Sequence, residues 1–146
     1  MSTPKRLAVL PSWLLGQVAL DARRLVGDAL GQAGYRRQHF AVLLALDEQG
    51  QASQAELGRR LWIDRSDLHA VLAELERDGL VARVRDEHDR RRNVVRLTPA
   101  GVDALGRLDH QVRAAQEALL EPLSAADRRE LRRLLTSLVD HHAPRR

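Results

Sequence analysis

The stretch from Ser53 to Gly101, SQAELGRRLWIDRSDLHAVLAELERDGLVARVRDEHDRRRNVVRLTPAG, decides the fold of this chain. It opens with Ser53 and, three residues later, Glu56, which is the spacing of a capping box that satisfies the free amides of a helix start. Asp64 stands where it would cap a second helix after a three-residue turn. The stretch therefore predicts two short helices joined by a tight turn.

The second of these helices has one apolar and one polar face. Its buried stripe is predicted from residues spaced three and four apart: Leu68, Val71, Leu72 and Leu75. The start of its outer face is polar or small: Arg65, Ser66, Asp67, His69 and Ala70. In a helix-turn-helix the second helix enters the DNA major groove with its N-terminal residues at the base edges. These outward residues are therefore candidate DNA contacts.

A basic hairpin follows directly. Residues 80–85 and 93–97 read as two short strands rich in β-branched residues, joined by a polar turn over residues 86–92. Between Arg83 and Arg96 there are six arginines and three acids, a local balance of +3. Arginine on a projecting turn can contact phosphates or enter a narrow minor groove. The alternative is that the tip of the hairpin is only a solvated, charged surface. Because the hairpin directly follows a helix-turn-helix, a DNA-binding role is favoured.

Long amphipathic helices are predicted on both sides of this core. Pro11 suits the start of the first helix, another helix is predicted over residues 37–48, and Thr98 and Ser124 cap the last two. The fold class is mostly α with a small β-hairpin wing. We predict one domain over residues 1–146, with a winged helix-turn-helix core at 36–98 and dimerisation helices at 11–33 and 99–142.

Composition narrows the function. The 146 residues carry a net charge of +4, which favours an anionic partner, and the absence of cysteine excludes disulfides and thiol redox sensing. No apolar run approaches the ~20 residues that span a bilayer, and the first residues lack a signal-peptide pattern, so a cytoplasmic protein without membrane contact is expected. The sequence contains neither a nucleophile elbow nor a phosphate-binding loop, so no enzyme activity is expected. No cofactor or metal is expected, since the six histidines show no HxxxH or HExxH spacing.

Four motifs in register, ELGRRL at 56–61, LERDGLV at 75–81, DRR at 89–91 and LTPAG at 97–101, resemble the MarR (multiple antibiotic resistance regulator) family. The resemblance implies a homodimeric transcriptional regulator, usually a repressor, that is released from a near-palindromic operator on double-stranded DNA by a small ligand. It implies that the first and last helices form the dimer.

The resemblance also assigns roles to single residues. Ser53 and Gln54 would contact phosphate, while Arg65 and Ser66 would contact bases or backbone. In the wing, Asp89 would orient Arg91 at the minor groove, and Arg90 and Arg92 would add backbone contacts. Asp67 departs from the neutral residue that many members carry, and we interpret it as a cap of its helix rather than a cytosine contact.

A ligand site is also predicted. Trp13, Arg36, His39 and Phe40 would supply an aromatic wall and a cation for a phenolic or anionic effector, with Arg37 nearby. The alternative places Phe40 in the core, packs Trp62 at the turn and leaves the arginines solvated. Two other functions stay open for the whole chain: a winged-helix protein-interaction module, and a DNA-binding protein without an effector.

Overall fold

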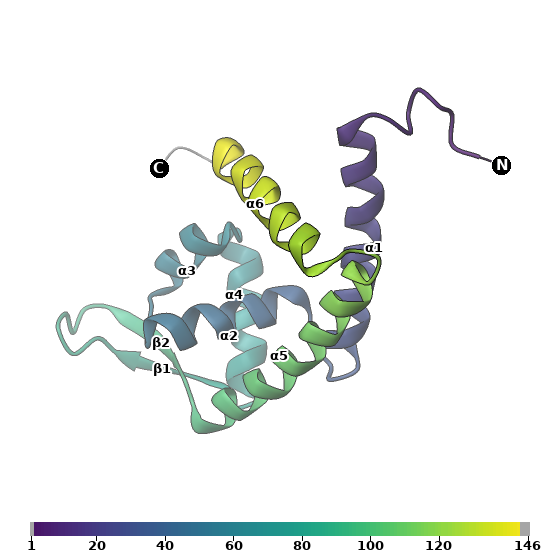
Figure 1. The fold of residues 1–146 in the computed structure, drawn as a ribbon. Helices are drawn as coiled ribbons and strands as arrows, with labels where there is room; N and C mark the ends of the chain where they lie inside the picture. The colour runs from purple at the N-terminus through teal and green to yellow at the C-terminus, as the bar shows by residue number, and fades with distance from the viewer. Residues whose placement is uncertain (1, 144–146) are drawn as a thin grey trace.

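The structure, a computed structural model, describes residues 2–143 as six α-helices and one β-hairpin (Figure 1). The elements in chain order are α1 (Pro11–Gly31), α2 (Arg37–Gln49), α3 (Gln54–Leu61), α4 (Arg65–Arg77), β1 (Val81–Arg85), β2 (Asn93–Leu97), α5 (Pro99–Leu120) and α6 (Ala125–His142). This confirms the predicted fold class, and each predicted element is present within a few residues of its expected bounds.

Short polar side chains begin four of the helices, as the sequence predicts. The backbone N–H groups of Glu56, Asp67, Gly101 and Asp127 donate to the capping oxygens of Ser53, Asp64, Thr98 and Ser124 at 3.0–3.2 Å. Each such cap stabilises its helix by about 1 kcal/mol. The caps therefore fix locally where α3, α4, α5 and α6 begin.

The core lies between α2, α4 and α5. The stripe predicted on α4 is buried, and it joins one apolar cluster with residues of α2, α3 and α5: Leu68, Val71, Leu72 and Leu75 with Val42, Leu43, Leu46, Leu57 and Leu108. Because this stripe faces inward, the opposite face of α4 has to face solvent.

The hairpin projects from this core (Figure 1). Its strands pair antiparallel from Val81 opposite Leu97 to Arg85 opposite Asn93. A two-stranded hairpin alone is marginally stable in water. Here Ala52, just before α3, exchanges two backbone hydrogen bonds of 3.0 and 2.8 Å with Val95, which ties the hairpin to the helices.

The outer helices leave apolar side chains exposed. α1 packs along α5, but α6 buries none of its residues. The exposed apolar residues of α1 and α6, with one residue before α1, are Leu10, Leu14, Leu15, Val18, Leu20, Leu134, Leu135, Leu138 and Val139. Val102 of α5 is also exposed. Within residues 2–143 no helix is both long and apolar enough to cross a bilayer.

The first turn of α5 is fastened to the start of β1. Thr98 donates its backbone N–H to the Leu80 carbonyl at 3.0 Å and its hydroxyl to the Gly79 carbonyl at 2.6 Å. A Cβ on Gly101 would lie 2.0 Å from the Leu80 oxygen, so only glycine permits this approach. The helix and the hairpin thus meet backbone to backbone.

We expect Gly101→Ala to destabilise the protein by more than about 2 kcal/mol, because the backbone atoms it meets cannot move away without breaking this joint. Gly106→Ala is the matched control on the same helix, since a Cβ added there would meet nothing within 4 Å, and it should stabilise by about 0.5–1 kcal/mol. Urea unfolding at fixed protein concentration measures both. Equal stability of the two variants would contradict the close approach.

Candidate nucleic-acid interface

The starts of α3 and α4 carry the first group of residues predicted to contact DNA. Ser53 caps α3 through its hydroxyl, and its own backbone N–H donates to Glu56 Oε2 at 2.8 Å. Gln54 donates from Nε2 to the carbonyl oxygen of Arg65 at 3.4 Å. The residues predicted to contact phosphate therefore lie at the start of α3, and Gln54 links that start to α4.

Asp64, rather than Asp67, caps α4. Asp64 Oδ1 accepts the Asp67 backbone N–H and the Ser66 hydroxyl, each at 3.0 Å. The hydrogen bond from the Asp67 amide is the main reason that the pKa of the Asp64 carboxyl is lowered, while contact with Asp64 raises the pKa of the Asp67 carboxyl. The interpretation of Asp67 as the cap was wrong, because only its amide takes part and its carboxylate remains exposed.

The outer face of α4 is open near its start. Arg65, Ser66 and His69 are exposed, and within residues 2–143 the Arg65 guanidinium makes no ion pair. Further along, Glu76 pairs with Arg83 of β1 at 2.9 Å. The cation available to a polyanion on this helix is therefore at its N-terminal end.

The wing presents a second group of cations. Asp89 Oδ1 accepts the backbone N–H of Arg91 at 3.1 Å, so the acid orders the turn through the main chain. The guanidinium groups of Arg90 and Arg91 are exposed and, across the described part of the chain, unpaired. Arg92 differs, since it is 2.9 Å from Glu56 Oε1 and 3.2 Å from Asp86 Oδ2.

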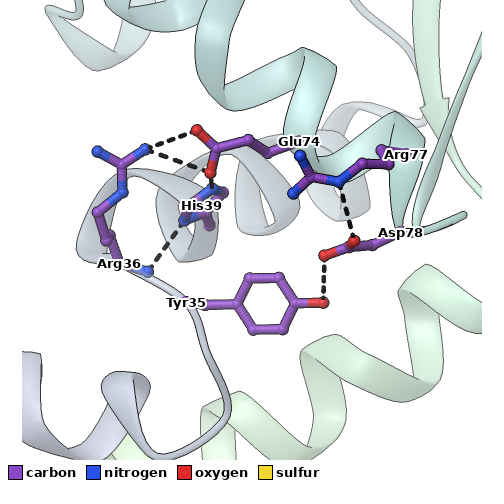
Figure 2. A network of polar contacts seen from close by, with 6 residues as sticks. All are labelled: Tyr35, Arg36, His39, Glu74, Arg77 and Asp78. Carbon is purple, nitrogen blue, oxygen red and sulfur yellow. Dashed lines mark hydrogen bonds and ion pairs between the residues drawn. The ribbon is translucent and has the colours of Figure 1, made fainter.

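A polar network holds the far half of α4 to the start of α2 (Figure 2). His39, only 2% exposed, accepts the Arg36 backbone N–H at Nδ1 (2.9 Å) and lies 2.8 Å from Glu74 Oε2 through Nε2. Since Nδ1 is an acceptor, the ring proton is assigned to Nε2, which donates to Glu74. Burial lowers the pKa of His39, and the bond from His39 lowers the pKa of Glu74. A neutral histidine thus takes the capping role that Glu56 has in α3.

The network extends through Tyr35 (Figure 2). Its hydroxyl donates to Asp78 Oδ2 at 3.1 Å, its ring packs edge-on against His39 with centroids 5.5 Å apart, and Arg77 lies 3.7 Å from Asp78. Burial, and then Asp78, raises the pKa of Tyr35. The chain between α1 and α2 therefore contacts two acids one helical turn apart, Glu74 within α4 and Asp78 at its C-cap.

The residues predicted for a ligand are only partly brought together. Arg36 pairs with Glu74 at 3.1 Å, both nitrogens of His39 are used, and Phe40 packs against the core. Trp13 lies near the other end of α1, about 25 Å along the helix axis from Leu30, so within one chain it does not join the other three. Trp62 is not packed at the turn: it is 57% exposed and has a left-handed backbone with φ of 55°.

Sequence reasoning missed the long-range contacts of these acids, although it placed Glu56 correctly in the capping box of α3. Glu74 lies 35 residues from His39, and Glu56 lies 36 residues from Arg92. The only signal in the sequence was the spacing of one helical turn between Glu74 and Asp78 at the end of the predicted helix.

Two helices joined by a short turn and followed by a basic hairpin define a winged helix-turn-helix DNA-binding protein. Known proteins of this class are similar in sequence. The sequence profile of the MarR family matches residues 33–92. The HTH-type transcriptional repressor Rv2887 of Mycobacterium tuberculosis is 32% identical over 126 residues, which cover 86% of this chain and 91% of that protein. The chain therefore belongs to the MarR family and is a transcriptional regulator of that type.

Solved structures show the same fold. A probable transcriptional regulator from Pseudomonas aeruginosa is 32% identical with a TM-score of 0.80, covering 90% of this chain and 98% of that one. The PcaV transcriptional regulator from Streptomyces coelicolor, in complex with its natural ligand, is 28% identical with a TM-score of 0.79, covering 96% and 98%.

We expect the free energy of unfolding to fall as the pH drops from about 7 to 5. The pKa of His39 is lower in the folded protein than the 6.5 of an unperturbed histidine, so the unfolded chain takes up the proton first and the folded state loses stability below that value. Glu74, whose pKa is lowered, stays ionised in this range. Arg36, Tyr35 and Asp78 also face the ring.

Urea unfolding at several pH values tests this against His39→Gln. The variant should be less stable at pH 7 and lose much of the pH dependence. If the free energy of unfolding changed with pH equally in both proteins, His39 would not be responsible for the pH dependence.

Proposed function

We propose that this protein is a dimeric repressor that binds a near-palindromic operator, with α4 in the major groove and the wing in the minor groove. The observation that carries this proposal is the contrast among its arginines: Arg65, Arg90 and Arg91 are unpaired among the described residues, whereas Arg83 and Arg92 are paired with acids. Unpaired guanidinium groups lose no protein partner when they bind phosphates or base edges. Such binding to chromosomal DNA would occur in the cytoplasm.

The proposed DNA contacts follow from which side chains are exposed and which already have a partner within the protein. Ser53 and Gln54 offer the α3 start to a phosphate, and Arg65, Ser66 and His69 offer hydrogen bonds to bases or backbone. Asp67 is the one acid at the start of this face, and it would be repelled by phosphate unless it accepts from a cytosine amino group. In the wing, Arg91 enters the minor groove from the turn that Asp89 orders, and Arg90 contacts the adjacent backbone.

A second copy of this chain is the proposed cover for α1 and α6. A helix of 18 residues that buries none of them gains little from tertiary packing, which supplies most helix stability in proteins. Its exposed leucines and those of α1 would be buried in a two-fold interface, with roughly 25 cal/mol gained per Å² of apolar surface. Two copies would also present two α4 helices to successive major grooves.

A small aromatic acid is the proposed effector. The PcaV structure in complex with its natural ligand supports control by a ligand, and Phe40 and Arg36 suggest the aromatic and anionic character of that ligand. A carboxylate beside Phe40 would compete with Glu74 for Arg36, whose ion pair helps to hold α4. Losing that pair would weaken the hold on the DNA-reading helix. A thermal-shift series with aromatic carboxylates tests this: an increase in melting temperature that Arg36→Gln abolishes supports the site, and no shift with any of them overturns it.

We expect Arg91→Ala to weaken operator binding more than tenfold and to reduce the slope of log K against log salt by about 0.9, the value of one phosphate-type contact. Arg113→Ala, which removes an equal charge from α5 where Arg113 pairs with Asp109, is the control and should change affinity less than about twofold. Fluorescence anisotropy with the gene's own upstream region measures both. Wild-type binding that does not respond to salt would argue instead for a protein-interaction module.

We expect Leu138→Asp to yield a monomer with greatly reduced operator affinity, because a charge would be buried at the proposed interface. Thr136→Asp is the matched control: two positions away is about 200° around the helix, so the same group stays in solvent and the dimer should persist. Sedimentation velocity distinguishes the two states. A dimeric Leu138→Asp protein would remove α6 from the interface.

A further inference from the structure

Arg92 makes two ion pairs within the described chain, unlike its neighbours Arg90 and Arg91 in the wing turn. It leaves the turn at the base of β2, and its guanidinium reaches two acids from different elements: Glu56 in the first turn of α3, at 2.9 Å, and Asp86 at the other side of the turn, at 3.2 Å. One side chain therefore joins the two sides of the wing to each other and to α3.

Both acids are themselves held in place. Glu56 uses its second oxygen to accept the Ser53 backbone N–H at 2.8 Å, and this bond is the main cause of the lowered pKa of its carboxyl. Asp86 is 8% exposed, and its Oδ1 accepts the His88 backbone N–H at 2.9 Å. The Asp86 N–H in turn donates to the Arg92 carbonyl at 2.8 Å. Arg92 thus binds acceptors whose own orientation is already fixed.

This arrangement distinguishes Arg92 from its neighbours in the turn. Two carboxylates surround one guanidinium, so the cluster of Arg92, Glu56 and Asp86 carries a net charge of −1 and repels a phosphate rather than attracting it. Arg90 and Arg91, two and one residues earlier, have no such partners among the described residues.

We infer that Arg92 is a positioning residue, which fixes the wing against α3 through Glu56 and Asp86 and makes no phosphate contact of its own. This inference rests on the proposed function, because it concerns the same DNA interface. The ion pair with Glu56 links the phosphate-binding start of α3 at Ser53 to the turn that carries Arg91. Holding these two contact points at a set separation before DNA arrives lowers the ordering cost of binding.

The direction in which one substitution changes operator affinity distinguishes a phosphate contact by Arg92 from a positioning role. Glu56→Gln removes a negative charge near DNA but keeps the capping box, in which glutamine also serves. If Arg92 contacted phosphate, freeing it from Glu56 would strengthen operator binding. If Arg92 positions the wing, Glu56→Gln weakens binding, and we expect roughly a three- to tenfold loss.

A double-mutant cycle completes the test. Arg92→Gln should weaken binding by a similar factor, and the double variant Glu56→Gln with Arg92→Gln should be no weaker than Arg92→Gln alone, since both remove one contact. Arg92→Lys keeps the charge but lacks the planar fork that reaches two acids, so it should restore little of the affinity. Arg90→Gln is the matched control. It should change operator affinity by the same factor in the wild-type protein and in the Glu56→Gln variant.

A measurement without DNA keeps the inference separate from the proposed function. Amide hydrogen exchange over residues 86–92 should become faster in Arg92→Gln and Glu56→Gln but not in Arg90→Gln. Additive losses, tighter binding by Glu56→Gln, full rescue by lysine, or unchanged exchange would each overturn the positioning role. Failure of the proposed function would show instead as a wild-type protein that does not bind its operator.

Discussion

The buried stripe of α4 is the constraint on which the proposed DNA interface depends. Leu68, Val71, Leu72 and Leu75 are each at most 1% exposed, so the helix cannot rotate about its axis without exposing leucine to water. Its rotation determines which residues face outward, and with them the positions of Arg65 and Ser66. Packing chemistry that has nothing to do with DNA thus sets the surface proposed to meet it.

Polar contacts at the two ends of α4 add what apolar packing leaves undetermined. Apolar side chains resist rotation but allow a helix to slide, because their attraction has little direction. At the start, Asp64 and Gln54 fix the first turn relative to α3; in the second half, His39 and Tyr35 hold Glu74 and Asp78. The histidine suits this place because it can be both acceptor and donor while neutral, so no unpaired charge has to be buried.

The features that sequence could predict are local ones. Ser53, Asp64, Thr98 and Ser124 act on amides three residues away, and the stripe of α4 follows helical periodicity, so each was visible within a few residues. The ion pair of Arg92 with Glu56 and the bond of His39 to Glu74 join residues 36 and 35 positions apart, which only the packed chain brings together. For the same reason the sequence shows how many arginines the wing has but does not show that Arg92 is paired while Arg91 is not. It also does not show whether the amide or the carboxylate of Asp67 takes part in capping α4.

The joint between α5 and the hairpin links the angle of the hairpin to the position of the far end of α5. Thr98 and Gly101 fasten the first turn of α5 to the backbone at Gly79 and Leu80, where the hairpin begins. From that fulcrum the 22 residues of α5 extend about 33 Å at roughly 1.5 Å per residue, so a tilt of about 5° moves the far end by about 3 Å. A rigid joint would therefore couple small angular changes at the hairpin to larger displacements at the remote end of α5.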